Sequence, residues 1–224
     1  NFGIVVVNTL LIRLIFPTAA VGIAMLAEER AWGVLNLVEL PTALTIFFAV
    51  IVLDLIIYLQ HVAFHRIPLL WRLHRMHHSD LDFDVTTGAR FHPIEIILSM
   101  VIKFAAVILI GTPAVAVGIF EVLLNAAAMF NHSNIQLRTS IDRVLRLIIV
   151  TPDMHRVHHS ILREETDSNF GFNIPWWDRL FGTYCAQPKA GHSNMTIGID
   201  QFQKPKFLRL DRLLIQPFLG KSDD

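Results

Sequence analysis

The chain has 224 residues, of which 53% are hydrophobic and only 17% charged, so it is more apolar than most soluble domains. Its 19 Lys and Arg residues balance its 19 Asp and Glu residues, and a formal net charge of zero argues against a basic nucleic-acid-binding protein. The single cysteine, Cys185, excludes an internal disulfide and a cysteine-rich zinc site. Eleven histidines are the other unusual feature of the composition.

The apolar residues are concentrated in long blocks that alternate with polar ones. The first block contains two candidate membrane spans, roughly residues 2–27 and 37–59, separated by a short polar turn at Glu28 to Arg30. The second block contains two shorter candidates, roughly 94–110 and 113–130, separated at Gly111-Thr112-Pro113, where a helix is disfavoured. We therefore predict an all-α integral membrane protein with about four transmembrane helices, arranged as two helical hairpins. The alternative is a soluble all-α protein with unusually apolar core helices.

The polar blocks, residues 61–93 and 131–224, carry 16 of the 19 Lys and Arg residues. The positive-inside rule then predicts that both lie on the cytoplasmic side of a multi-pass membrane protein. They are too short or too irregular to suggest independent domains. Residues 1–224 are thus predicted to form a single membrane-embedded domain with a cytosolic helical cap.

Histidines cluster where the polar blocks meet the predicted spans. His61 and His65 are four residues apart, and the pattern HxxHH occurs twice, at His74, His77 and His78 and again at His155, His158 and His159. Spacings of three and four residues place side chains on one face of a helix. Imidazole suits zinc, copper, iron and nickel. A zinc site needs about four ligands, whereas eight or nine converging histidines suffice for two metal ions.

These motifs resemble a known family. HVAFH, HRMHHS, FNHSN, HRVHHS and NFGFNIPWWDRLFGTY together look like the fatty acid hydroxylase and sterol desaturase superfamily of integral-membrane di-iron enzymes, over roughly Asp54 to Tyr184. The resemblance implies nine metal ligands: His61, His65, His74, His77, His78, His132, His155, His158 and His159. Some relatives have another histidine four residues after His132, where this chain has Gln136.

Several polar residues are candidates for positions around the metal site. Asp54 and Tyr58 lie on one helical stripe with His61 and His65, while Glu121 and Asn125 repeat that spacing towards His132. The remaining candidates are His92, Asp153 and Asn169. The simpler explanation for the intramembrane residues is an interhelical hydrogen bond, and for His92 a structural role. No residue is predicted to act in catalysis apart from the metal centre.

The function that this sequence predicts is O₂-dependent, di-iron oxidation of an unactivated C–H bond in a fatty acyl, sterol or related lipid, with hydroxylation favoured. Desaturation and ether-lipid monooxygenation are alternatives on the same site. The cofactors would be two iron ions, which zinc can replace in a purified sample, with O₂ as co-substrate. Electrons would come from outside the chain because it contains no nucleotide-binding fingerprint; the resemblance implies a ferredoxin, rubredoxin or cytochrome b5-like donor.

Two functions of other classes remain open. One is a zinc-dependent lipid hydrolase that uses a single metal ion and an activated water. The other is a membrane metal transporter, in which Glu39, Asp54 and Glu121 would mark an ion path.

Overall fold

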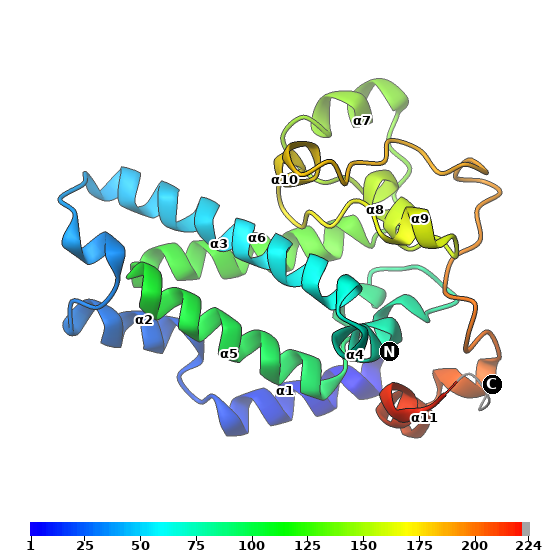
Figure 1. Ribbon diagram of the computed structural model, residues 1–224, viewed down its shortest axis with the longest axis horizontal. Helices are drawn as coiled ribbons and strands as arrows, with labels where there is room; N and C mark the ends of the chain where they lie inside the picture. Colours follow the sequence, from blue (N-terminus) through cyan, green and yellow to red (C-terminus); the bar gives the residue numbers. More distant parts are fainter. Residues whose placement is uncertain (221–224) are drawn as a thin grey trace.

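The computed structural model describes residues 1–220, and this part of the chain is helical (Figure 1). Its first six α-helices are α1 (Phe2–Ile15), α2 (Ala19–Glu29), α3 (Thr42–Arg66), α4 (Pro68–His78), α5 (Pro93–Ile110) and α6 (Ala114–Asn131). Five shorter helices follow within the described residues: α7 (Thr139–Leu145), α8 (Pro152–His158), α9 (Arg163–Thr166), α10 (Trp176–Leu180) and α11 (Leu210–Ile215). Extended pairing among residues 1–220 is limited to one isolated bridge between Ser160 and Ile197.

The described residues contain four segments long and apolar enough to cross a membrane, namely Phe2–Leu37, Thr42–Arg66, Pro93–Ile110 and Ala114–Asn131. Only 17% to 28% of each span is buried inside the protein. Exposed apolar side chains such as Leu14, Leu109 and Val122 cover much of the remainder. A protein in water would bury such an apolar surface, so these helices are suited to contact with membrane lipid. The predicted all-α membrane fold with four spans is confirmed.

The first span differs from the predicted single helix. It is divided into α1 and α2 at Pro17, which lacks a backbone N–H and disfavours the helical conformation of Phe16 before it. Accordingly, Phe16 has φ −125° and ψ 66°, and Ala19 has a positive φ of 51°. The second span begins at Thr42 rather than near residue 37, and α3 continues to Arg66, so His61 and His65 lie on its last turns, as their helical spacing with Asp54 and Tyr58 predicts.

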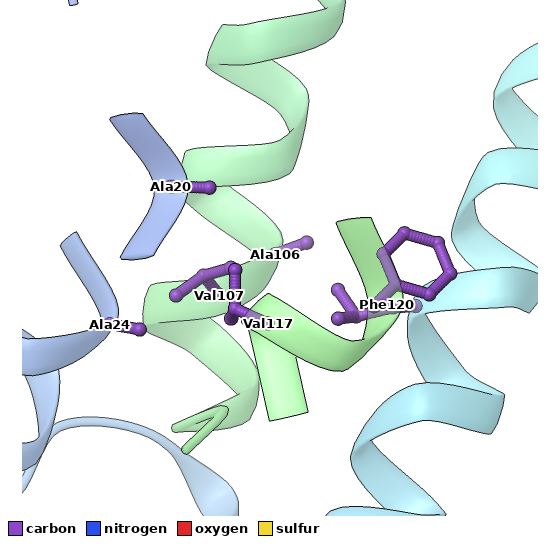
Figure 2. Packing of buried hydrophobic residues seen from close by; sticks show 7 residues of the cluster. Ala20, Ala24, Ala106, Val107, Val117 and Phe120 are labelled. Atoms are coloured by element: carbon purple, nitrogen blue, oxygen red, sulfur yellow. The ribbon is translucent and has the colours of Figure 1, made fainter. Parts of the chain in front are cut away.

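The membrane helices pack through small residues. Ala20 and Ala24 of α2 face Val107 of α5 and Val117 of α6, and Phe120 fills the space towards α3 (Figure 2). All of these side chains are essentially inaccessible. Small side chains let helix backbones approach closely where lipid gives no hydrophobic driving force for association.

The α5–α6 hairpin returns the chain to the end of the bundle from which it left. Its turn uses Gly111, whose φ of 73° is left-handed and whose missing Cβ would lie 2.6 Å from the Trp32 carbonyl. Consequently the C-terminal ends of α3 and α6 and the start of α5 share one end of the bundle, where α4 and α8 pack against them (Figure 1). Every predicted histidine cluster lies at this end.

Candidate metal centre

Two consecutive helices supply five histidines from the first half of the chain. His61 and His65 lie one turn apart on α3. Ile67 then takes an extended conformation, and Pro68 begins α4, which carries His74, His77 and His78. Because α4 folds back against the end of α3, the two sets of imidazoles face each other.

The other four histidines come from α6 and α8. His132 is the C-cap residue of α6. His155 and His158 lie on α8, which begins with Pro152 and is capped by Thr151, while His159 ends the helix. The short helix therefore orients all three rings of the second HxxHH motif.

All nine predicted histidines meet in two adjoining groups. The five-histidine group is His61, His65, His74, His78 and His158, and the four-histidine group is His77, His132, His155 and His159. Within each group the available ligand nitrogens lie within 4.8 Å of one another, and every member is buried. The groups touch where the rings of His78 and His159 stack with their centroids 4.5 Å apart. Gln136 belongs to neither group.

Four rings of the five-histidine group are oriented through Nδ1. His61 Nδ1 donates to the Phe170 carbonyl at 2.8 Å, and His158 Nδ1 donates to the Ser168 carbonyl at 2.7 Å. Two carboxylates do the same for the other rings: Glu95 Oε1 lies 2.6 Å from His74 Nδ1, and Asp167 Oδ1 lies 3.3 Å from His65 Nδ1. In all four, Nε2 is buried without a partner among the described residues. Metal-binding histidines typically have such a hydrogen bond on the outer nitrogen and a free inner nitrogen.

Three of these four contacts come from one stretch of chain, which we call the 167–173 segment. Asn169 holds it by donating to the Met154 and Cys185 carbonyls and accepting from the Cys185 N–H. Its φ of 50° is left-handed, a conformation that asparagine tolerates better than most residues. Asp178 accepts hydrogen bonds from the backbone N–H groups of Phe170 and Gly171, each at 2.8 Å. This segment thus acts as a rigid support for the five-histidine group.

The four-histidine group is held mainly by ring packing. Phe91 stacks on His77 with an angle of 8° between the rings, and Phe83 contacts His132 and His159. His132 Nδ1 donates to the Ala128 carbonyl at 2.7 Å, so its Nε2 carries the lone pair. That Nε2 lies 3.3 Å from His77 Nε2 and 3.1 Å from His155 Nε2.

This donor set fits a pair of transition-metal ions. Burial lowers the pKa of His132 from 6.5 to about 4 and that of His158 to about 3, and it also lowers the pKa values of His77, His78, His155 and His159. These rings are neutral at pH 7, as metal ligation requires. Buried ring nitrogens with no hydrogen-bond partner are costly in a protein interior, and a bound cation would satisfy them.

A cavity of about 490 Å³ leads from the membrane helices to this centre. It lies between α1, α3, α5 and α6, and its walls include His61 and His74 of the five-histidine group. Ile12, Ile57 and Leu124 are among its apolar lining residues. An alkyl chain could reach the histidines from the apolar part of the molecule by this route.

The residues predicted to surround the histidines have more varied positions. Asn169 supports the 167–173 segment, as described above. Asp54 accepts hydrogen bonds from Asn173 Nδ2 at 2.7 Å and Trp177 Nε1 at 2.8 Å, so it joins α3 to the end of the same segment. Tyr58 bonds to Thr183 through its hydroxyl and packs against Phe170. Asp54 and Tyr58 thus contact the 167–173 segment, which in turn contacts the histidines.

The other four candidates have their hydrogen bonds elsewhere. His92 caps α5 by accepting from the Ile94 N–H, and its Nε2 donates to the Leu214 carbonyl, which is a structural role. Glu121 pairs with Lys103 at 2.6 Å, and Asn125 donates to the Glu121 carbonyl. Asp153 forms an ion pair with Arg156. Helical spacing aligned Glu121 and Asn125 with His132, and His92 and Asp153 were candidates because they lie next to a span or a histidine cluster, but each of the four bonds to another partner.

Sequence reasoning missed Glu95 and Asp167, the two carboxylates that contact the histidines. Glu95 had a signal, because it is an acidic residue near the start of an apolar span, three positions after His92. Asp167 lies in a polar stretch with other acidic residues and has no distinguishing pattern. The Phe170 and Ser168 carbonyls have none either, because backbone groups are the same in every residue.

Comparison with known proteins identifies a family for this chain. The sequence profile described as fatty acid hydroxylase matches residues 46–183. The chain is 30% identical over 182 residues to the ornithine lipid hydroxylase of Rhizobium tropici, covering 81% of this chain and 53% of that protein. It is 28% identical over 180 residues to human alkylglycerol monooxygenase, covering 78% of this chain and 39% of that protein.

A very-long-chain aldehyde decarbonylase of rice is 32% identical over 161 residues, which is 67% of this chain and 25% of that protein. The chain therefore spans about half the length of the bacterial relative and less of the others. No solved structure matches it.

Proposed function

The chain belongs to the fatty acid hydroxylase family, and from this premise we propose that it hydroxylates a lipid at an unactivated C–H bond. The observation that carries the proposal is the pair of adjoining, buried histidine groups at the end of a cavity that opens among the membrane helices. In the reaction, one oxygen atom of O₂ enters the C–H bond and the other leaves as water, with two electrons and two protons supplied from outside.

Iron is the metal that this proposal assigns to both groups. The five-histidine and four-histidine groups would each hold one iron ion, and bound iron would supply the capacity to activate O₂. The nine imidazoles are the ligands we propose. Zinc binding to the same nitrogens in a purified sample would not contradict this assignment.

The chain itself supplies positioning. The carbonyls of Ser168 and Phe170 and the carboxylates of Glu95 and Asp167 hold four imidazoles in one tautomer and orientation. The cavity would hold a lipid with its reacting C–H bond close to His61 and His74, and its apolar lining residues would keep bulk water away from the reacting carbon.

The alternative classes are less well supported. A hydrolase of the usual type needs one metal with three or four ligands, whereas nine histidines form two groups here. For a transporter, Glu39, Asp54 and Glu121 would have to mark an ion path, but Asp54 and Glu121 already have their own partners. Desaturation and ether cleavage could share the proposed site, and identification of the product distinguishes them from hydroxylation.

The proposal extends to the setting of the reaction. Residues 1–224 would act as one membrane-embedded unit, with the cap of residues 61–93 and 131–224 facing the cytoplasm; its last four positions lie outside the described residues. The cations of the cap would favour docking of an acidic electron donor of the ferredoxin, rubredoxin or cytochrome b5 type.

The test is to reconstitute the iron-loaded protein with a donor system in membranes of native lipid under ¹⁸O₂. Mass spectrometry should detect a lipid carrying one ¹⁸O atom, and the product should be absent with His77→Ala and His158→Ala. A lipid lacking two hydrogens would instead indicate desaturation. If neither product depends on these histidines, lipid oxidation at this site is rejected.

A further inference from the structure

The cavity wall beside the five-histidine group carries hydrogen-bond acceptors that have no partner in the protein. We propose that the ligand of this cavity is a lipid whose donor-bearing polar group, a hydroxyl or an ammonium, enters beside the histidines, and that Asn8 and Gln60 bind it. The inference rests on the proposed function in placing a lipid there, and it narrows the substrate class. A bare hydrocarbon chain is the alternative it excludes.

Asn8 of α1 gives the clearest evidence. Its side-chain Nδ2 donates to the Phe91 carbonyl at 2.8 Å, and since a carbonyl can only accept, this bond fixes which end of the amide is the oxygen. The oxygen, Oδ1, is buried without a partner among the described residues. Asn8 is 8% exposed and lines the cavity, so a donor inside the cavity is what its oxygen lacks.

Gln60 and Glu95 add polar atoms without a partner to the same cavity. Gln60 directly precedes His61; one end of its side-chain amide bonds to Ser99 Oγ at 3.0 Å, and the other end has no partner among the described residues. Glu95 uses Oε1 for His74, and its Oε2 likewise remains without a partner. These three residues belong to different helices, α1, α3 and α5, and all line the cavity together with His61 and His74.

A hydrocarbon occupant does not suit this arrangement. An alkyl group packed against these polar atoms would exclude water and leave each of them unsatisfied, which costs binding free energy. A hydroxyl or ammonium group would satisfy them. The more distant wall is also polar in part, because Lys103 and Glu121 pair at 2.6 Å within the membrane helices and line the same cavity. The apolar lining residues Ile57 and Leu124 leave room for the alkyl portion.

The test compares two lipids of nearly equal shape. Metal-loaded protein in nanodiscs is given equal amounts of 1,2-hexadecanediol and 1,2-difluorohexadecane, and native mass spectrometry measures the ratio of the two bound. No reductant is added, so nothing turns over. We expect the diol to be favoured by about tenfold or more, the size of one or two hydrogen bonds.

Three variants assign the preference to residues. Asn8→Leu and Gln60→Leu should each lower the diol preference by about threefold or more. Thr9→Val is the matched control: Thr9 lines the same cavity, but its hydroxyl already donates to the Val5 carbonyl, so the preference should not change. The metal content of each variant shows whether the histidine groups are intact.

The inference is overturned if the wild-type protein binds both lipids equally, or if the preference survives in both leucine variants. If Asn8→Leu does not fold, the wild-type ratio and Gln60→Leu still decide. A diol preference without an ¹⁸O-labelled product would reject the proposed oxidation and leave this inference standing. An oxidised product without the preference would do the reverse.

Discussion

The two histidine groups have similar compositions but are held in different ways. In the five-histidine group, four rings are fixed by hydrogen bonds from Nδ1, and two of the acceptors are the carboxylates of Glu95 and Asp167. In the four-histidine group, the outer contact to protein among the described residues is His132 to the Ala128 carbonyl, and Phe83 and Phe91 pack around the rings. The first group is thus preorganised and more negative, and the second is held by shape.

This difference predicts two metal sites of unequal strength. Outer hydrogen bonds keep imidazoles in the ligating tautomer and raise their basicity, and nearby carboxylates offset the charge of a cation. Among residues 1–220 the four-histidine group has fewer ligands and no carboxylate bonded to its rings, so its metal should leave more easily.

The largest effect should come from removing one ligand of either group. His158→Ala and His159→Ala should each reduce the bound metal from two ions to one and reduce formation of the ¹⁸O-labelled product on the order of 100-fold or more. Elemental analysis and product quantification give the two values. His192→Ala is the control, because His192 belongs to neither group. Full metal occupancy in both variants would contradict the assignment of these ligands.

Glu95→Gln should have the next largest effect, because it removes the carboxylate charge next to His74 Nδ1 while keeping the shape of the side chain. Metal affinity of the five-histidine group should fall on the order of 10- to 100-fold. Competition with a chelator measures that affinity. Glu121→Gln is the matched control, because Glu121 pairs with Lys103 and contacts no histidine ligand. Equal affinities in the two variants would show that the His74–Glu95 contact does not support the metal.

A direct comparison of the groups uses the single-site variants. His159→Ala leaves the five-histidine group intact, and His158→Ala leaves the four-histidine group intact. Under the same chelator concentration, the metal should leave the His158→Ala protein about tenfold faster. If the metal left both at the same rate, the unequal outer contacts would have no energetic consequence.

How much of this centre the sequence predicts depends on what kind of group is involved. Eight of the nine histidines were predictable because spacings of three and four residues place side chains on one helical face, and α3, α4 and α8 realise those spacings. His132, at the end of α6, has no such spacing and was predicted only from the resemblance of its FNHSN motif. The carbonyls of Ser168 and Phe170 were not predictable, because backbone atoms carry no residue identity. Asp54 was found by its helical stripe, but its actual partners, Asn173 and Trp177, are more than a hundred residues away in the chain.

The membrane spans follow mainly from local features of the sequence. Their number follows from runs of apolar residues, and the α5–α6 turn follows from Gly111 and Pro113. The break at Pro17 also has a local cause. It was not predicted because residues 2–27 are long enough to cross a membrane as a single helix. The continuation of α3 through His65 follows from the helical spacing of Asp54, Tyr58, His61 and His65, and the last turns of α3 pack against α4.

A smaller effect is expected from the outer support of the 167–173 segment. Asp54→Asn would place an NH₂ group against one of the two donors, Asn173 Nδ2 or Trp177 Nε1. An unsatisfied buried group costs about 1–3 kcal/mol, which lowers the melting temperature by roughly 2–4 °C per kcal/mol in a chain of this size. The metal of the five-histidine group should loosen, and that of the other group should not. Asp211→Asn, at an exposed ion pair, is the control.

The last prediction concerns a pH dependence of stability at Asp178, which bonds to the 167–173 segment. Burial raises the pKa of Asp178 from 3.8 to about 6. Between about pH 4 and pH 6 the folded protein therefore holds a proton that the unfolded chain has lost, so the free energy of unfolding falls as pH rises through this window and is level above it. Asp178→Asn cannot bind this proton. Subtracting its melting temperature from that of the wild type at each pH removes the contribution of the histidines, which both proteins share. The wild-type melting temperature relative to the variant should thus decline from pH 4 to pH 6. A difference that rises or stays constant would mean that the hydrogen bonds from Phe170, Gly171 and Thr183 outweigh burial and keep Asp178 ionised.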